Sequence, residues 1–222
     1  MTGGAVALAA MAARPSLADA VGKNAPNAIP PSEALKRLVT GNARYVGSGM
    51  HCNDVASGRA ARVSAQYPFA SILSCSDSRV VPELVFDQGP GDLFVVRVAG
   101  NFVTSDGLAS LEYGASVLGA PLIMVLGHSN CGAVAAAIKV VKDKAQLPGH
   151  LPELIDAIAP AVIAAETKHP ADLLAAAITE NVRRNVARLN RATPVLAARV
   201  KAGKLKVVGG VYDIATGKVA LV

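Results

Sequence analysis

The sequence predicts an α/β fold in which a mostly parallel central sheet is flanked by helices and preceded by an N-terminal helical arm. Short apolar runs of strand length alternate along the chain with longer segments whose apolar residues recur at helical spacing. Strands that lack a polar face are typical of a sheet covered by helices on both sides. With 222 residues, of which 52% are apolar and 17% charged, the chain can bury a sizeable core in one domain.

The N-terminal segment, residues 1–30, is expected to form an arm outside a single domain that spans residues 31–222. Ala5 to Ala13 is a small apolar run, and Ala18-Asp19-Ala20 resembles the end of an export signal, but a basic leading region is missing. A loosely packed arm is the favoured interpretation and a remnant of an export signal the second. A membrane anchor is disfavoured because no run is long enough to span a bilayer. The location stays open between the cytoplasm and, if residues 1–20 belong to an export signal, the periplasm or the outside of the cell.

The domain begins with a helix, which we expect to start at Pro30-Pro31-Ser32 with Ser32 as its N-cap and to pack outside the sheet. Four nearly continuous apolar runs have the length of buried strands and cover residues 69–74, 93–98, 122–126 and 206–212. Helical patterns separate these runs and lie at residues 108–118, 133–141 and 174–189. Thr104 or Ser105 is expected to cap the first of these helices, and Pro160 to kink or divide a further one.

The charge of the chain does not indicate a nucleic-acid-binding protein. The net charge is +6, but only 4% of the residues are aromatic and the basic residues are scattered. The densest basic group lies at helical spacing and consists of Arg183, Arg184, Arg188 and Arg191. A solvated helix face is favoured over a binding patch for this group. A nucleotide-binding protein is also disfavoured, because no Gly-x-Gly-x-x-Gly or Walker-type loop follows the strands.

Two of the expected strands end directly in sequences rich in metal-ligand side chains. Ser74-Cys75-Ser76-Asp77-Ser78-Arg79 follows the first, and Gly127-His128-Ser129-Asn130-Cys131-Gly132 follows the third. Because the carboxyl ends of parallel strands meet at one edge of a sheet, Cys75, His128 and Cys131 are expected to converge. Zinc favours thiolate and imidazole ligands, and a catalytic zinc site keeps a fourth position open for water. The sequence therefore predicts a three-ligand zinc site.

Together the two motifs resemble the paired zinc motifs of the β-class carbonic anhydrases. The similarity extends from about Ser32 to the end of the chain and includes the stretches Gly91–Arg97 and Leu111–Gly114. The resemblance implies a zinc lyase that reversibly hydrates carbon dioxide to bicarbonate and a proton by attack of a zinc-bound hydroxide. It also implies a homodimer or a dimer-based tetramer with active sites between subunits. Neither a nucleic-acid partner nor stable membrane insertion is expected.

The resemblance also implies roles for residues beside the metal. Asp77 and Arg79 match a dyad in which the carboxylate orients the hydroxide and the guanidinium keeps that carboxylate ionised and in place. Four further positions match substrate-contacting residues: Gln66, Phe94, Tyr113 and Gly132. Gln66 and the backbone N–H of Gly132 would donate hydrogen bonds to the substrate, and Phe94 and Tyr113 would form apolar walls. Ordinary core packing explains Phe94 and Tyr113 equally well.

Asp77 also matches a possible fourth zinc ligand in a closed state that some family members adopt at low pH. Members with that closable site typically carry a Trp three residues before the first Cys ligand, where this chain has Ile72. The resemblance therefore favours the open subtype. Two thiolates and a neutral imidazole cancel the double charge of zinc, whereas a three-histidine site lowers the pKa of bound water to about 7. We therefore expect activity to rise mainly above neutral pH.

Other functions fit the same ligand set. A related enzyme that hydrolyses carbon disulfide or carbonyl sulfide could use identical ligands, whereas a noncatalytic zinc-stabilised binding module would need a fourth protein ligand. For the proton that leaves during hydration, His51, His150 and His169 are candidate shuttles, but ordinary surface histidines are the favoured interpretation.

Overall fold

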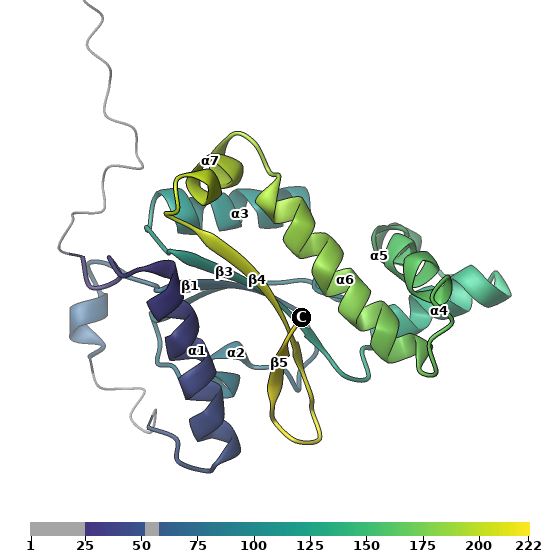
Figure 1. The fold of residues 1–222 in the computed structure, drawn as a ribbon, viewed down its shortest axis with the longest axis horizontal. Helices are drawn as coiled ribbons and strands as arrows, with labels where there is room; N and C mark the ends of the chain where they lie inside the picture. The colour runs from purple at the N-terminus through teal and green to yellow at the C-terminus, as the bar shows by residue number, and fades with distance from the viewer. Residues whose placement is uncertain (1–24, 52–57) are drawn as a thin grey trace, which may run out of the picture.

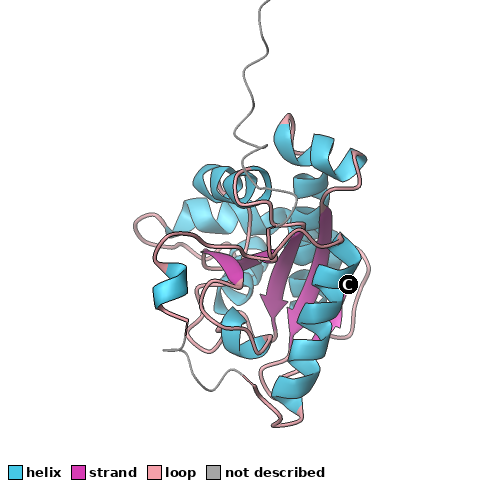
Figure 2. Ribbon diagram, turned by 90° about the vertical axis from the view of Figure 1, so that its left-hand side faces the viewer, coloured by secondary structure: helices cyan, strands magenta, loops and turns pink. Residues whose placement is uncertain are grey.

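The computed structural model describes residues 25–51 and 58–222. Most of the expected arm lies outside the described part of the chain, and so does Cys52, the cysteine of the sequence that is not among the predicted metal ligands. The described residues form a five-stranded sheet with helices on both faces (Figures 1 and 2). This arrangement confirms the predicted α/β class.

The sheet has the strand order β2-β1-β3-β4-β5. Its strands are β1 (Ala70–Ser74), β2 (Leu93–Arg97), β3 (Leu122–His128), β4 (Lys206–Tyr212) and β5 (Val219–Leu221). The first four are parallel, and β5 pairs with β4 in the antiparallel direction. All four predicted strands are confirmed, and β3 continues two residues beyond the prediction to His128. The sequence analysis missed β5, whose three residues are too few to show a periodic pattern.

The helices form two layers around the sheet and a separate projecting group. The helices are α1 (Pro31–Val46), α2 (Pro82–Val85), α3 (Ser105–Ser116), α4 (Gly132–Asp143), α5 (Leu151–Glu166), α6 (Leu173–Asn190) and α7 (Val195–Lys201), with a 3-10 turn at Ala60–Arg62. One face of the sheet is covered by α1 and α2 and the other by α3, α6 and α7, while α4 and α5 pack against α6 (Figure 1). Alternate residues of β3 enter the two layers, which explains its uninterrupted apolar sequence.

The helix ends correct one prediction and confirm another. Pro30 is the N-cap of α1 and Ser32 lies inside the first turn, so the prediction of Ser32 as cap is wrong. The ring of Pro31 fixes the backbone in a helical conformation at the first position, so the helix starts two residues earlier than a cap at Ser32 would place it. Thr104 caps α3 as predicted, because its Oγ1 accepts a hydrogen bond from the Gly107 N–H at 3.0 Å. Pro160 lies inside α5 and does not divide it.

The segment immediately before α1 packs onto the domain. The side chain of Asn27 is 1% exposed, and its Nδ2 donates hydrogen bonds to the carbonyl oxygens of Pro68 at 3.0 Å and Leu118 at 2.7 Å. These contacts join the segment to the loop before β1 and to the end of the α3 region. Among the described residues, none of the helices combines the length and apolar character needed to cross a bilayer.

Candidate metal centre

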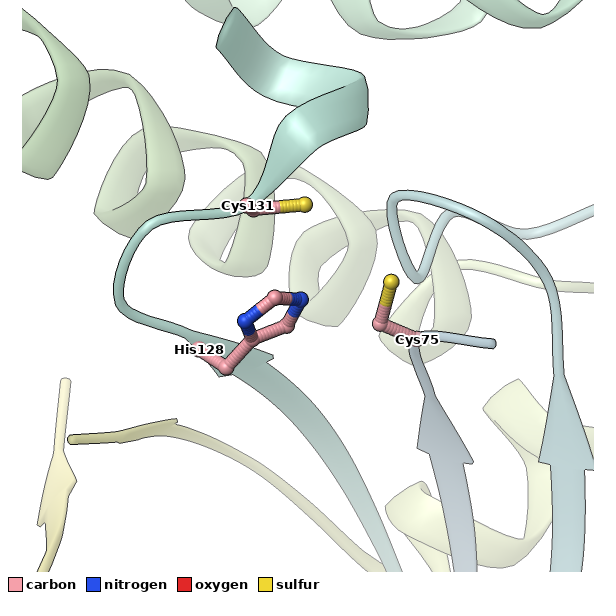
Figure 3. A group of neighbouring side chains, drawn as sticks. All are labelled: Cys75, His128 and Cys131. Atoms are coloured by element: carbon pink, nitrogen blue, oxygen red, sulfur yellow. The ribbon is translucent and has the colours of Figure 1, made fainter. Parts of the chain in front are cut away.

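The three predicted ligands come together at the carboxyl end of the sheet. Cys75 directly follows β1, His128 is the last residue of β3, and Cys131 is the N-cap of α4 (Figure 3). Their ligand atoms all lie within 4.8 Å of one another, and the side chains are 3%, 0% and 1% exposed, respectively. The turn between His128 and Cys131 contains Asn130 in the left-handed region at φ 55°, which reverses the chain so that both side chains face the same space.

The donor atoms fit a cation that prefers sulfur and nitrogen. His128 Nδ1 lies 2.9 Å from the Ser129 carbonyl oxygen, which selects the tautomer that donates from Nδ1 and leaves a lone pair on Nε2. His128 Nε2 is buried and has no hydrogen-bond partner among the described residues. The imidazole and the two sulfurs point toward one another (Figure 3). An unpartnered buried acceptor between two thiol groups is costly without a ligand, and a tetrahedral zinc ion would satisfy all three.

Electrostatic coupling within the group favours one thiolate before any metal binds. A hydrogen bond from Cys131 lowers the pKa of Cys75 to about 4, against the opposing effect of burial. The same interaction raises the pKa of Cys131, because its proton is held by the Cys75 sulfur. Burial by itself would lower the pKa of His128, but its interactions with the Cys75 thiolate raise it above the ordinary value. The Gly100 N–H also donates to Cys75 Sγ at 3.3 Å.

Asp77 and Arg79 form a bidentate ion pair beside the three ligands. Arg79 Nε lies 2.9 Å from Asp77 Oδ1, and Arg79 Nη2 lies 2.7 Å from Asp77 Oδ2. The side chain of Asp77 is 16% exposed and that of Arg79 52%. The hydrogen bonds from Arg79 hold the pKa of Asp77 well below its usual range. Asp77 Oδ2 lies 3.8 Å from His128 Nε2, so the ionised carboxylate borders the metal centre.

Arg97 holds the turn that carries Cys75 and Asp77. It is the last residue of β2, and it donates from Nε to the Cys75 carbonyl oxygen at 3.0 Å and from Nη2 to the Asp77 carbonyl oxygen at 2.7 Å. The sequence analysis assigned it no role. The available signal was a charged residue at the end of an apolar strand, next to the strand that supplies the first ligand.

The predicted substrate-contacting residues do not all lie at the metal centre. Gly132 is exposed and begins α4 directly after Cys131. Gln66 is exposed in the loop before β1 and has no hydrogen-bond partner among the described residues. Phe94 and Tyr113 form a tilted ring pair with centroids 6.2 Å apart. Phe94 pairs in register with Ser71, four residues before Cys75, which places the pair about 13 Å along the strand from the metal centre.

The remaining polar candidates lie away from this centre on the surface. His51, His150 and His169 are exposed, as expected for ordinary surface histidines. The four arginines at helical spacing are exposed, three of them on α6 and Arg191 directly after it, and they line a groove of about 900 Å³. Arg188 also donates from Nη1 to the Val103 carbonyl oxygen at 2.8 Å, so its role includes holding a loop.

Comparisons with known proteins agree with this geometry. The family model described as carbonic anhydrase matches residues 70–219. Carbonic anhydrase 2 of Mycobacterium tuberculosis is 37% identical over 192 residues, which cover 86% of this chain and 92% of the relative. A carbonic anhydrase of Pseudomonas aeruginosa is 40% identical over 162 residues, which cover 69% of this chain and 73% of the relative.

Solved structures extend the similarity to the fold. The β-carbonic anhydrase CcaA has a TM-score of 0.66 and 28% identity over 85% of this chain and 87% of its own. The Coccomyxa β-carbonic anhydrase, solved with acetazolamide, has a TM-score of 0.64 and 30% identity, and the match covers 85% of this chain and 86% of that chain. One tetrameric β-carbonic anhydrase of Sordaria macrospora has a TM-score of 0.66 and 25% identity, and the match covers 86% of this chain and 97% of that chain. The matching family model, the relatives, the fold and the Cys-His-Cys geometry together show that this chain belongs to the β-class carbonic anhydrases.

Proposed function

We propose that this carbonic anhydrase uses zinc held by Cys75, His128 and Cys131, and that Asp77 and Arg79 direct the nucleophile. The observation that carries the proposal is the buried group of three ligand atoms within 4.8 Å, in which His128 Nε2 has no other partner among the described residues. Zinc in this shell would act as a Lewis acid that lowers the pKa of a water molecule and so supplies a nucleophile near neutral pH. The protein supplies the position of that nucleophile and of carbon dioxide.

Asp77 is suited to orient the nucleophile because it remains a hydrogen-bond acceptor. Its low pKa keeps the carboxylate ionised throughout the neutral range, where a protonated carboxyl would donate instead. By accepting a hydrogen bond from the O–H of a hydroxide, Asp77 would leave an oxygen lone pair free to attack the carbon of carbon dioxide. Arg79 contacts both carboxylate oxygens and therefore fixes the plane of the group as well as its charge.

The same ion pair supports the open subtype. A fourth-ligand role for Asp77 would require its carboxylate to leave Arg79, and in this structure both oxygens accept hydrogen bonds from the guanidinium. Ile72 is fully buried within β1 and packs in the core beneath α1, so the position that distinguishes the closable subtype holds an aliphatic side chain. Among the described residues, the ligand atoms placed to hold a metal ion are the two sulfurs and the imidazole nitrogen, and the Asp77 carboxylate is not one of them.

We place Gln66, Phe94 and Tyr113 at a site shared between two copies of the chain. Gln66 and Tyr113 are exposed in one copy. Phe94 lies on β2, an edge strand of the sheet, and is half-buried beside Tyr113 of α3. The tetrameric Sordaria macrospora enzyme shows that this fold assembles in a relative. A homodimer or a dimer-based tetramer of this chain would bring these side chains to a partner's metal centre, where Gln66 can donate to a substrate oxygen and the rings can line an apolar pocket.

Zinc content and stopped-flow hydration of carbon dioxide across pH, measured on the same preparation, test the proposal. One zinc per chain is expected, with a rate that rises mainly above pH ~7 because two thiolates leave the metal less electrophilic than three histidines do. A correctly folded, metal-free and active protein would refute the zinc assignment. A rate that is already flat from mildly acidic pH upward would refute the predicted ionisation.

A further inference from the structure

Helix α6 carries polar side chains on the stripe that faces the loop between β2 and α3. Asn181 and Asn185 are 2% and 6% exposed, and Arg188 continues the same stripe one turn later. Two buried amides on a helix that packs against a sheet are costly unless each is fully hydrogen-bonded. Their partners therefore indicate why these positions are polar.

All three side chains bind the backbone of residues 98–103. Asn181 Nδ2 donates to the Gly100 carbonyl oxygen at 2.8 Å, and Asn185 Oδ1 accepts from the Val103 N–H at 2.8 Å. Arg188 Nη1 donates to the Val103 carbonyl oxygen at 2.8 Å. The amide orientations are fixed, because Asn185 Nδ2 also donates to the Asn181 carbonyl oxygen at 2.8 Å and to Asn181 Oδ1 at 3.2 Å. The loop is thus held by α6 over more than one full helical turn.

The other end of this network is a metal ligand. The Gly100 N–H donates to Cys75 Sγ at 3.3 Å while the carbonyl of the same residue is bound by Asn181. Gly100 has φ 82°, and a Cβ there would lie 2.5 Å from Ile158 Cδ1 and 3.3 Å from Ala133 Cβ. The residue is therefore wedged against α4 and α5, and the hydrogen bond that its carbonyl accepts from Asn181 holds it at the position from which its N–H reaches the Cys75 sulfur.

We infer that Asn181 is a positioning residue of the metal centre, which acts through Gly100 to aim a backbone donor at the Cys75 sulfur. An N–H donor stabilises a thiolate and orients its remaining lone pairs toward the metal. Partners of metal ligands typically change metal affinity or activity 10- to 100-fold when removed. This inference rests on the proposed zinc site, and it assigns to α6 a function in that site besides packing.

The variant Asn181→Ala tests the inference, with Asn42→Ala as the matched control. Asn42 is also a buried asparagine on a helix, 7% exposed, and it bonds the backbone of Val85, Gly217 and Val219 instead of the loop at Gly100. Zinc affinity is measured by competition with a chromophoric chelator, well below the melting temperature of each variant. We expect Asn181→Ala to weaken zinc binding about 10- to 100-fold, and Asn42→Ala to lower the melting temperature while affinity stays at the wild-type value.

The thiolate-to-cobalt charge-transfer band of Co²⁺-substituted protein provides a second readout. A changed donor to Cys75 Sγ alters the electron density on the sulfur, so the band is expected to shift in Asn181→Ala and to stay unchanged in Asn42→Ala. A purely structural role of Asn181 would lower the melting temperature without moving the band or the affinity, and that result would overturn the inference.

Arg188→Met keeps the test decisive if Asn181→Ala fails to fold, because Arg188 is exposed and its substitution leaves the core intact. Its control is Arg191→Met, an exposed arginine of the same basic group that lies just after α6. Arg188→Met is expected to weaken zinc binding severalfold and Arg191→Met to leave it unchanged. Equal affinities in Arg188→Met and Arg191→Met would overturn the inference, whereas a wild-type protein that binds no zinc would overturn the proposed function itself.

Discussion

Two groups of candidate site residues differ in how far a single chain completes them. The metal-binding group consists of Cys75, Asp77, Arg79, His128 and Cys131. Its ligands are buried and close together, and its carboxylate is held in place. The outer group consists of Gln66, Phe94 and Tyr113, of which Tyr113 is 47% exposed and Gln66 lies on an exposed loop. A single chain therefore assembles the metal-binding group, whereas in our proposal the outer group acts at a site that a second copy of the chain completes.

Loss of one ligand should have the largest effect, because the metal-binding group acts as a unit. His128→Ala removes the imidazole and leaves two coupled sulfurs, so we expect loss of zinc together with loss of the catalysed rate to background. Zinc quantification and stopped-flow hydration measure both. His150→Ala is the matched control, since that histidine is 97% exposed, and it should retain metal and rate. A zinc-free but active His128→Ala protein would contradict the assignment.

Asp77→Asn should separate chemistry from metal binding within the same group. The amide preserves shape but can donate where the carboxylate accepts, so kcat/KM should fall roughly 10²- to 10³-fold while zinc content stays at the wild-type level. The exposed Asp156 on α5 provides the control, and Asp156→Asn should leave both quantities unchanged. Near-normal turnover in Asp77→Asn would remove Asp77 from the mechanism.

Arg79→Met should give a smaller loss that depends on pH. Arg79 holds the pKa of Asp77 far below its usual range, so its removal lets that pKa rise toward the ordinary value and adds a further loss of rate relative to the wild type at acidic pH, where the carboxylate becomes protonated. The loss near neutral pH should be about tenfold. The ionised Asp77 also stabilises the fold above about pH 4, the pKa of an unfolded Asp, and this contribution disappears as pH falls through the lower folded-state pKa. The rate of Arg79→Lys should lie between the rates of the wild type and Arg79→Met. An Arg79→Met protein that loses no additional rate relative to the wild type at acidic pH would contradict the ion pair as the cause.

Gln66→Ala should have the smallest effect and tests the outer group directly. Loss of one neutral hydrogen bond predicts a fall in kcat/KM of roughly three- to tenfold, with zinc retained. If Gln66 serves the metal centre of a partner, mixing Gln66→Ala protein with His128→Ala protein should restore wild-type sites in mixed oligomers. Activity above the sum of the separate proteins is the expected result. A mixture that is demonstrably exchanged but shows no gain would place Gln66 in its own chain's site or outside any site.

The sequence predicted the metal-binding group because its signals are local. Cys75 and His128 lie at the ends of two apolar strands, and Cys131 follows three residues after His128. Parallel strands bring such ends to one edge of the sheet, so the three ligands could be placed together from the sequence. The network of Asn181, Asn185 and Gly100 could not be predicted in this way. Its hydrogen bonds join residues more than 80 positions apart, and asparagines in a helical pattern look like ordinary interruptions of the apolar stripe.

The roles of the outer group came from family resemblance, and they stay predictions, because the proposed site includes a surface of a second copy of the chain. The misplaced cap of α1 has a simpler cause. Side-chain capping chemistry favoured Ser32, whereas the fixed backbone angle of Pro31 decided where the helix begins.

The hydrogen bonds of Asn27 connect the beginning of the described chain to the loop that carries Gln66, the proposed substrate-binding residue. Asn27 donates a hydrogen bond to the carbonyl oxygen of Pro68, which lies two residues after Gln66. The loop that carries Gln66 is therefore held at this end by a residue that precedes α1. Removing residues up to and including Asn27 would release this end of the loop and leave the carbonyl oxygens of Pro68 and Leu118 without the hydrogen bonds that Asn27 donates. Such a shortened protein should keep its zinc yet bind carbon dioxide with less precision.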